Sequence, residues 1–393
     1  SGLASVGCPV TDIDIASSPT AEWMVKKEKA AGCVIVSASH NPPEWNALKV
    51  VDGNGVSVSR ERGAEIEKKL GKTKLAPWDS AGAITKNDLA IRDHIKAIAS
   101  HVSGERIRQK KPKIVLDCGN GTACGIAPQL FKFLGCEILT INSHPDGRFP
   151  GRPSEPTEAN VKELISLVKS ARADAGVAWD GDGDRVVFVD EKGSYVIGDK
   201  VYALSVIWRA EKEKGKKLTG EVVTTVATSR AVEDVAKRFG AKVRYTAIGA
   251  PYLTEEMAAK PAILGGEEVG GVIWPELSLA KDGFLTAAKM AGAVCEKPLS
   301  EWLEEVPEYY NVKLKVSADD KKKKEVVSRV LAHAKKSKLA FADVDGVRIN
   351  FDHSWVIVRA SGTEPYVRIF AEARTQAEAE KLAKEYEKIA LGR

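Results

Sequence analysis

The sequence lacks long apolar runs and is poor in cysteine. It contains no apolar stretch as long as the ~18 residues that a membrane-spanning helix needs, and no signal peptide. Its six cysteines are scattered, and none forms a Cys-x-x-Cys pair. These absences predict no membrane partner, no disulfide framework and a cytoplasmic location with reduced thiols.

An excess of charge of one sign is also missing. The chain has 59 basic and 54 acidic residues, a net charge of +5 over 393 residues. That balance provides no basis for nucleic-acid binding, so we predict no nucleic-acid partner. The composition is ordinary for a soluble globular protein, and the length predicts about two to four domains.

Three carboxylates stand at alternate positions between two apolar, strand-like runs. Asp180, Asp182 and Asp184 are separated by glycines, which allow the backbone to fold tightly and turn the carboxylates toward one point. Three hard oxygen donors around one point suit Mg²⁺. With Arg185 beside them to hold substrate oxygens, this loop predicts a catalytic Mg²⁺ site for phosphate chemistry.

Two other interpretations of this loop stay open from the residues alone. Asp and Gly are ordinary turn residues, so the loop could be a plain acidic turn. The three aspartates and Glu191 also occupy ligand positions of an EF-hand loop, although Arg185 stands where that motif has glycine. The strand-like flanks argue against both interpretations.

A polar loop, residues 37–43 (Ser-Ala-Ser-His-Asn-Pro-Pro), follows a buried strand at 33–36. Because α/β folds place their chemistry at the carboxyl ends of strands, this loop is a candidate site. A serine hydrolase would need a Gly-x-Ser-x-Gly turn, which is absent. What remains, besides a plain loop, is a serine, Ser39, that carries or receives a group, with Lys49 to supply a proton or a charge.

Two further segments suit polar ligands, although each could also be an exposed turn. A strand at 263–264 enters a glycine loop in which Glu267 offers a carboxylate, a group that accepts two hydrogen bonds from sugar hydroxyls. Near the carboxyl end, two arginines, two hydroxyls and a glycine turn lie within ten residues, as a phosphate site requires. The residues of this second segment are Arg359, Ser361, Gly362, Thr363 and Arg368.

The order of apolar segments predicts the fold class. Strand, helix and strand follow one another over 10–36, which predicts a parallel sheet, with Ser18 as the helix N-cap and Pro19 after it. Similar α/β units follow, and beyond 307 alternating strands predict an α+β unit with an antiparallel sheet. The predicted domains are 1–103 with the serine loop, 104–195 with the metal loop, 196–306 for sugar recognition and 307–393 for phosphate binding.

Four motifs in this order resemble the α-D-phosphohexomutase family, which includes phosphoglucomutase, phosphomannomutase and phosphoglucosamine mutase. They are the serine loop with Asn46-x-x-Lys49, the 180–185 loop, the 263–271 loop and the 359–365 loop. The resemblance covers essentially the whole chain. It implies three similar α/β domains with mixed sheets and a C-terminal α+β domain with an antiparallel sheet, around a central cleft.

The sequence departs from the family pattern at three places. Family members begin with a further strand and helix that carry an Arg-Gly phosphate loop, so we expect this chain to start inside its first domain. Pro251 and Val269 stand at positions where the family has a basic and a polar residue. These changes leave the choice among glucose, mannose and glucosamine phosphates open.

The resemblance implies a mutase that interconverts hexose 1-phosphate and 6-phosphate. The phosphoryl group would pass through a phosphoserine and a hexose 1,6-bisphosphate, which would also be the activator. A non-catalytic sugar-phosphate-binding protein and an aspartate-dependent phosphatase are the alternatives, and homo-oligomerisation is left open. The implied roles are catalysis by Ser39, His40, Lys49 and Arg185, Mg²⁺ binding by Ser39, Asp180, Asp182 and Asp184, and substrate binding by Glu267 and the 359–368 segment.

Overall fold

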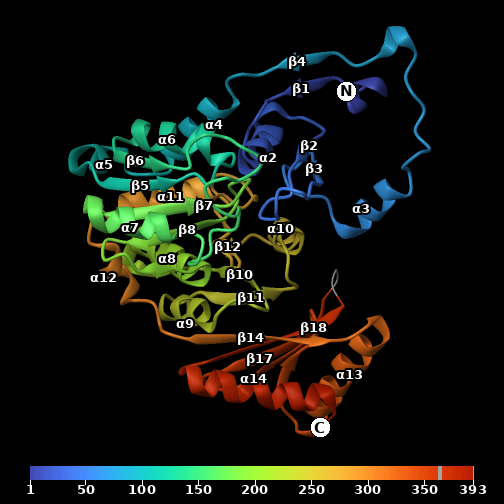
Figure 1. Cartoon of the computed structure of the whole chain (residues 1–393), viewed down its shortest axis with the longest axis vertical. Helices are drawn as coiled ribbons and strands as arrows, with labels where there is room; N and C mark the ends of the chain where they lie inside the picture. Colours follow the sequence, from blue (N-terminus) through green and yellow to red (C-terminus); the bar gives the residue numbers. More distant parts are fainter. Residues whose placement is uncertain (362–364, 393) are drawn as a thin grey trace.

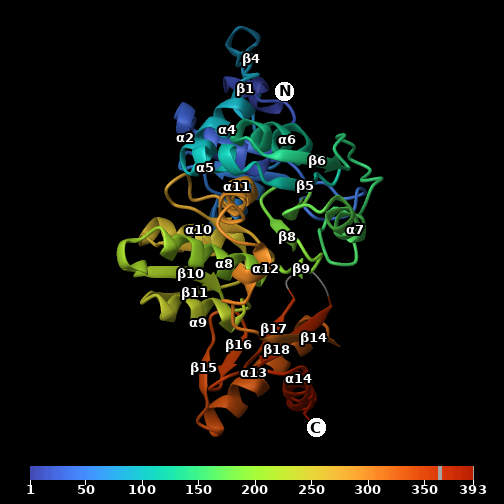
Figure 2. The same cartoon turned by 90° about the vertical axis from the view of Figure 1, so that its left-hand side faces the viewer.

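The computed structural model describes residues 1–361 and 365–392. Figures 1 and 2 both place the C-terminal sheet at one end of the long axis and the N-terminal strands at the other. Two larger mixed sheets lie between them, and one large buried cluster of apolar side chains joins these two sheets. No helix in the described ranges is both long and apolar enough to cross a membrane.

The N-terminal region holds two separate pairs of strands. β1 (Val10–Asp12) pairs in parallel with β4 (Ile84–Lys86), and β2 (Gly32–Val36) pairs antiparallel with β3 (Leu48–Asp52). The predicted parallel sheet over 10–36 is therefore wrong, because β1 and β2 share no sheet. The connection from β1 to β2 contains a helix and would permit parallel pairing, but each strand has another partner: β2 turns back directly through 37–47 to pair with β3, and β1 pairs with the more distant β4.

The helix between β1 and β2 is α2 (Ser18–Glu28), and its cap differs from the prediction. Ser17, not Ser18, is the N-cap, and its side chain accepts a hydrogen bond from the N–H of Thr20 at 3.2 Å. The capping preference for serine applied equally to the two neighbouring serines. Ser18 is thereby left to interact elsewhere. Two further helices of this region are α3 (Arg60–Glu67) and α4 (Ala90–Ser100).

The second sheet carries the aspartate loop. Its strand order is β6-β5-β7-β8-β9, parallel among the first three and antiparallel among the rest. Every residue of the two strands flanking the loop is buried, which explains their unbroken apolar runs. The strands are β5 (Lys113–Asp117), β6 (Glu137–Ile141), β7 (Ala175–Trp179), β8 (Val186–Asp190) and β9 (Tyr195–Val196), with helices α5 (Gly104–Lys110), α6 (Ala123–Leu134) and α7 (Lys162–Ala171).

The third sheet is also mixed, with the order β11-β10-β12-β13. Its first three strands are parallel, and β13 is antiparallel to β12. The elements are β10 (Glu221–Thr225), β11 (Lys242–Thr246), β12 (Leu264–Gly266) and β13 (Val272–Ile273), with helices α8 (Gly198–Glu211), α9 (Arg230–Arg238), α10 (Ala250–Ala259), α11 (Gly283–Ala293) and α12 (Leu299–Leu303).

The C-terminal sheet is antiparallel throughout, as predicted. Val356 and Val358 on its strand β17 face the helices, whereas Trp355 and Ile357 pack against Val226 of the third sheet's region. The short edge strand β15 was not predicted. In sheet order the strands are β14 (Tyr310–Ser317), β18 (Tyr366–Ala373), β17 (Trp355–Ala360), β16 (Val347–Asn350) and β15 (Ala340–Ala342), with helices α13 (Asp320–Lys336) and α14 (Gln376–Leu391).

Candidate active site

The three aspartates come together in the hairpin between β7 and β8. Asp180, Asp182 and Asp184 are all buried, and each offers a carboxylate oxygen within 4.8 Å of the other two. Asp180 Oδ1 accepts hydrogen bonds from the backbone N–H groups of Gly183 at 3.1 Å and Arg185 at 3.2 Å. These two bonds fold the loop back on itself, which is what turns the carboxylates to one point.

The surroundings of the carboxylate oxygens favour a cation site over a plain acidic turn. Asp182 Oδ1 and Asp184 Oδ1 are buried, and neither accepts a hydrogen bond within the described residues. Leaving such atoms unpaired costs about 1–3 kcal/mol each, more for charged groups, unless a metal ion binds them. The EF-hand interpretation is wrong, because strands flank the loop and Glu191 accepts hydrogen bonds from Ser300 instead.

Ser39 faces this triad from the loop after β2. Its Oγ donates to Asp180 Oδ2 at 2.8 Å. The backbone is held on both sides, since the Ser39 N–H donates to Ser37 Oγ at 2.9 Å and the Ser39 carbonyl accepts from Ser154 Oγ at 2.9 Å. Ser39 has φ +53°, a strained conformation for a residue with a side chain, and such strain is often found at functional sites.

The serine loop can approach the aspartates only because a glycine lies between them. A Cβ atom on Gly181 would lie 2.5 Å from the Ser39 carbonyl oxygen and 2.6 Å from Ser154 Oγ. On its other side, a Cβ on Gly121 would lie 2.5 Å from the Gly181 oxygen. The glycine-rich turn after β5 therefore packs tightly against the aspartate loop.

Cationic side chains surround the triad. Lys49 Nζ pairs with Asp182 Oδ2, while Lys281 Nζ lies 3.0 Å from Asp184 Oδ2 and 2.6 Å from Glu267 Oε1. Burial would raise the pKa of Asp184, but Lys281, Lys49 and the neighbouring arginine outweigh it and hold that pKa below its usual range. The two lysines thus keep part of this buried cluster ionised.

Asp180 behaves in the opposite way. Burial, followed by the charges of Asp184 and Asp182, raises the pKa of Asp180 well above its usual range. The same causes raise the pKa of nearby Glu22 to about 8, with burial the largest. The site therefore carries more carboxylates than its own lysines and arginine can neutralise, which again favours a bound cation.

The two proton-transfer candidates differ in charge at neutral pH. Burial and the positive charge of Arg185 lower the pKa of His40, whose Nδ1 lies 4.0 Å from Glu155 Oε2. Burial lowers the pKa of Lys49, but the negative charges of Asp182 and Asp184 outweigh the effect of burial, so the pKa of Lys49 is raised. His40 is therefore neutral and able to accept a proton, and Lys49 is charged and able to donate one.

The predicted sugar-binding carboxylate lies at the end of β12. Glu267 is 5% exposed and is linked through Lys281 to the metal loop. Its neighbour Glu268 accepts a hydrogen bond from Thr225 Oγ1 at 3.0 Å. Pro251, where a basic residue was expected, lies in the first turn of α10.

The predicted phosphate-binding segment lies on two paired strands. Arg359 of β17 and Arg368 of β18 are direct cross-strand partners, an unfavourable arrangement of like charges that an anion would relieve. Arg359 Nη2 lies 3.0 Å from Asp345 Oδ2, and the Ser361 carbonyl accepts from Lys323 Nζ at 3.0 Å. Gly362 and Thr363 lie outside the described residues.

The structure adds residues that sequence reasoning did not place in the site. Ser18 Oγ donates to Asp182 Oδ2 at 2.5 Å, and Glu155 Oε2 accepts from Arg185 Nη1 at 2.9 Å. Lys281 joins the triad to Glu267. Lys281 was expected near the sugar-binding cleft, because its Lys-Asp-Gly segment resembles a segment of the family, but its link to the triad was not predicted. Ser18 and Glu155 are far from the aspartates in sequence, and nothing local marks them.

Two small strand pairs, two mixed sheets and an antiparallel C-terminal sheet hold a serine against a buried carboxylate triad. This is the arrangement expected of a phosphohexomutase, an isomerase that moves a phosphoryl group within its substrate. Family models confirm this. The models of the phosphoglucomutase/phosphomannomutase alpha/beta/alpha domains I, II and III match residues 1–76, 92–193 and 198–310, and that of the C-terminal domain matches 312–389. The chain belongs to the phosphoglucomutase/phosphomannomutase family.

Individual relatives agree. A phosphoglucomutase/phosphomannomutase of Thermococcus kodakarensis is 41% identical over 383 residues, covering 96% of this chain and 83% of the relative. A phosphoglucosamine mutase of Methanococcus vannielii is 36% identical over 393 residues, covering 97% and 85%. The crystal structure of a phosphoglucomutase/phosphomannomutase family protein from Burkholderia thailandensis shares the fold, with a TM-score of 0.84 at 23% identity, over 99% of this chain and 84% of the other.

Proposed function

We propose that the protein interconverts hexose 1-phosphates and hexose 6-phosphates, with Ser39 as carrier of the transferred phosphoryl group. The observation that carries this proposal is the 2.8 Å contact between Ser39 Oγ and Asp180 Oδ2, at a buried triad of carboxylates. A phosphoryl group on Ser39 would add about −1.5 to −2 charge at this place. That charge beside three aspartates requires a cation.

Asp180, Asp182, Asp184 and an oxygen on Ser39 would hold Mg²⁺. Carboxylate oxygens are the ligands that Mg²⁺ prefers, and two of them lack a hydrogen-bond donor within the described residues. When bound, the ion supplies positive charge to the oxygens of the phosphoryl group. Arg185, held by Glu155, supplies further charge beside them.

In the first transfer, a hydroxyl oxygen of the bound hexose phosphate attacks the phosphorus on Ser39. The new phosphorus–oxygen bond forms as the bond to Ser39 Oγ breaks, and the product is a hexose 1,6-bisphosphate. Neutral His40 accepts the hydroxyl proton, and charged Lys49 donates a proton to the departing serine oxygen.

In the second transfer, Ser39 Oγ attacks the other phosphorus of the bisphosphate and the sugar oxygen leaves. The serine proton returns to Lys49, and the leaving sugar oxygen takes the proton held by His40. Ser39 is phosphorylated again, so the cycle balances. An unphosphorylated chain starts with neutral His40 and charged Lys49, so during loading His40 would accept the serine proton and Lys49 would protonate the leaving sugar oxygen. Hexose 1,6-bisphosphate would in this way phosphorylate Ser39 and act as activator.

The two transfers need a binding site for whichever phosphate is not reacting. The paired arginines 359 and 368 on β17 and β18, with Ser361, suit this role because they present positive charge and a hydroxyl together. Gly362 and Thr363 complete the proposed set. Glu267 would bind the sugar hydroxyls in either orientation, and Lys281 fixes its carboxylate. The hexose class is proposed here, and the choice among glucose, mannose and glucosamine stays open.

Mass spectrometry of the peptide containing Ser39 tests the proposal. After incubation with Mg²⁺ and glucose 1,6-bisphosphate, we expect one phosphate on Ser39 in the wild type and none in Ser39→Ala. The Ser39→Ala variant should lose mutase turnover by at least about 1,000-fold, since it lacks the nucleophile, yet still bind hexose phosphate. Ser37→Ala is the matched control: it removes an acceptor for the Ser39 N–H but keeps the nucleophile, and it should still be phosphorylated.

A phosphate-release assay separates this function from an aspartate-dependent phosphatase. The mutase converts glucose 1-phosphate to glucose 6-phosphate and conserves phosphate, whereas a phosphatase releases it. Full turnover by Ser39→Ala, or stoichiometric release of phosphate by the wild type, would overturn the proposed function. None of the comparisons supports a non-catalytic binding protein.

A further inference from the structure

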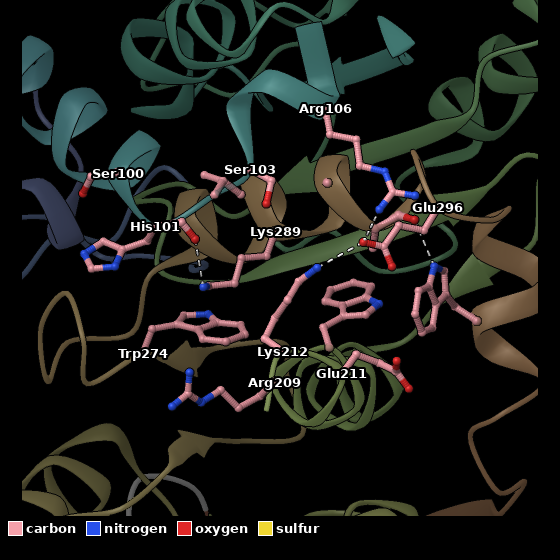
Figure 3. Close-up of a pocket in the computed structure, with 15 residues that line it drawn as sticks. Ser100, His101, Ser103, Arg106, Arg209, Glu211, Lys212, Trp274, Lys289 and Glu296 are labelled. Atoms are coloured by element: carbon pink, nitrogen blue, oxygen red, sulfur yellow. Dashed lines mark hydrogen bonds and ion pairs between the residues drawn. The ribbon is translucent and has the colours of Figure 1, made fainter. Parts of the chain in front are cut away.

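A cavity of about 320 Å³ lies away from the candidate active site, among α5, α8, α11 and α12. Figure 3 shows its lining. No residue that lines it belongs to the serine loop, the aspartate loop or the sugar loop. Pockets that bind small molecules measure roughly 300–1,000 Å³, so the cavity is large enough for a small ligand.

Four cationic side chains reach this cavity from three different helices. They are Arg106 of α5, Arg209 of α8, Lys212 as the C-cap of α8, and Lys289 of α11. In Figure 3, Arg106 and Lys212 converge on the same carboxylate, that of Glu296. The distances to Glu296 Oε1 are 2.9 Å from Arg106 Nη1 and 3.0 Å from Lys212 Nζ. One carboxylate therefore serves two cations.

The remaining two cations have one carboxylate each. Arg209 Nη2 lies 2.9 Å from Glu213 Oε1, and Lys289 Nζ lies 3.1 Å from Glu276 Oε1. Burial lowers the pKa of Lys289, and the charges of Arg209 and Lys212 lower it further, against the opposing effect of Glu276. A fourth carboxylate, Glu211, also lines the cavity but pairs with Lys216, outside it, at 2.7 Å. The four cations are thus left with three carboxylates, and the positive charges act on one another across the cavity.

Three indoles also line the cavity, beside polar side chains that include Ser100, Ser103 and His101. Trp208, Trp274 and Trp302 line it, and all three are buried. Two of the indoles are fixed by hydrogen bonds, from Trp274 Nε1 to Thr286 Oγ1 at 2.9 Å and from Trp302 Nε1 to the Ala293 carbonyl at 3.1 Å. These two hydrogen bonds fix the indoles, so this part of the wall is preformed.

We propose that this cavity binds a small phosphomonoester that carries an apolar ring, of which a nucleoside monophosphate is the representative. The phosphate supplies the negative charge that the four cations lack, and the ring matches the three indoles. A hexose phosphate would place hydroxyl groups against the indoles, and an uncharged ring would leave the cations unmatched. The site is separate from the one at which the chain acts on its substrate.

Isothermal titration calorimetry of the whole chain tests the proposal, with adenosine 5′-monophosphate as the probe. We expect saturable binding at least about tenfold tighter than that of adenosine or inorganic phosphate alone, equivalent to about 1.4 kcal/mol. Saturating glucose 1-phosphate should leave this binding unchanged. Displacement of the probe by glucose 1-phosphate would show that the probe binds in the active site. Absence of saturable binding would show that the cavity does not bind a nucleoside monophosphate. Either result overturns the proposal.

Variants locate the binding site. Lys289→Met should weaken binding of adenosine 5′-monophosphate by about tenfold, because it removes one cation and keeps the length of the side chain. Lys297→Met is the matched control: Lys297 also packs over an indole, at 4.1 Å from the Trp302 ring, and pairs with Glu305, but it does not line the cavity. Lys297→Met should bind adenosine 5′-monophosphate as tightly as the wild type does.

Lys212→Gln provides a second test, since Lys212 is largely exposed and its replacement leaves folding intact. We expect weaker probe binding with mutase turnover unchanged, and the same turnover in Lys289→Met. If both variants bind adenosine 5′-monophosphate as tightly as the wild type, the cavity is not its site and the proposal is wrong.

Discussion

Two groups of carboxylates are taken out of water in this protein, and they differ in how their oxygens are satisfied. One group is the triad of Asp180, Asp182 and Asp184. The other lies where the C-terminal sheet meets the third sheet's region, and consists of Asp199 at the start of α8 and Glu372 on β18. Burial raises the pKa of both members of this second group.

The second group is satisfied by neutral N–H donors. Glu372 Oε1 accepts from the Arg230 backbone at 2.8 Å and from Trp355 Nε1 at 2.7 Å, and Asp199 Oδ1 accepts from the Ser229 backbone at 2.7 Å. The triad, by contrast, has buried oxygens without donors and lysines close by. Burial of a carboxylate is thus no sign of a functional site by itself.

The largest effect should come from the triad. Asp182→Asn removes one carboxylate of the proposed metal site, and we expect kcat/KM to fall at least about 100-fold, because metal charge stabilisation is worth several kcal/mol. Glu372→Gln is the control from the other group, and its kcat/KM should stay within about twofold of the wild type. Steady-state kinetics in saturating Mg²⁺ measures both. Equal losses of kcat/KM in Asp182→Asn and Glu372→Gln would show that the two groups of carboxylates do not differ in their importance for catalysis.

Mg²⁺ should raise the free energy of unfolding only by binding to the aspartate triad. At an Mg²⁺ concentration about 100 times its Kd, the free energy of unfolding should rise by about 2.7 kcal/mol, since the ion binds the folded chain alone. Thermal unfolding with Mg²⁺ and with a chelator measures this shift. We expect it in the wild type and in Glu372→Gln but not in Asp182→Asn. A shift that persists in Asp182→Asn would place the ion elsewhere.

Truncation in the second group should affect stability rather than activity. Glu372→Ala leaves the Arg230 N–H and Trp355 Nε1 without their acceptor, at a cost of about 1–3 kcal/mol in the free energy of unfolding. Denaturant unfolding measures this loss, with the exposed-surface variant Glu380→Ala as control. Unchanged stability of Glu372→Ala would mean that water satisfies those donors.

The smallest effect should be a change in pH dependence. The pKa of Glu372 is raised above its ordinary value of 4.5, so the folded chain retains a proton that the unfolded chain has released. The contribution of this group is therefore full below about pH 4.5 and is lost as pH rises toward the folded-state pKa. Glu372→Gln cannot lose that proton.

Relative to the wild type, the Gln variant should accordingly become more stable between pH 4 and pH 8, by less than about 1 kcal/mol. Any cost of its amide nitrogen, which needs an acceptor in the same buried place, applies equally at both pH values. Unfolding measured across this range provides the comparison. A variant that is less stable at pH 8 than at pH 4, relative to the wild type, would contradict the raised pKa.

The motifs were predictable because their chemistry is local. Alternating aspartates and glycines can converge within one hairpin, and the serine loop follows a recognisable strand. The failures were long-range. Whether β2 pairs with β1 or with β3 depends on sheet partners, and whether Ser17 or Ser18 caps α2 depends on Asp182, 164 residues away from Ser18 in sequence.

The sequence by itself determined the family, the triad, the serine and the order of the four regions, since each rests on neighbouring residues and on apolar periodicity. Tertiary structure alone decided which side chains complete the site. Ser18, Glu155 and Lys281 reach the aspartates and their arginine from distant segments. It also gathered four cations from three helices around one cavity. Charge and hydrogen-bond complementarity between distant segments arises only when the chain folds. No local sequence pattern can therefore predict it.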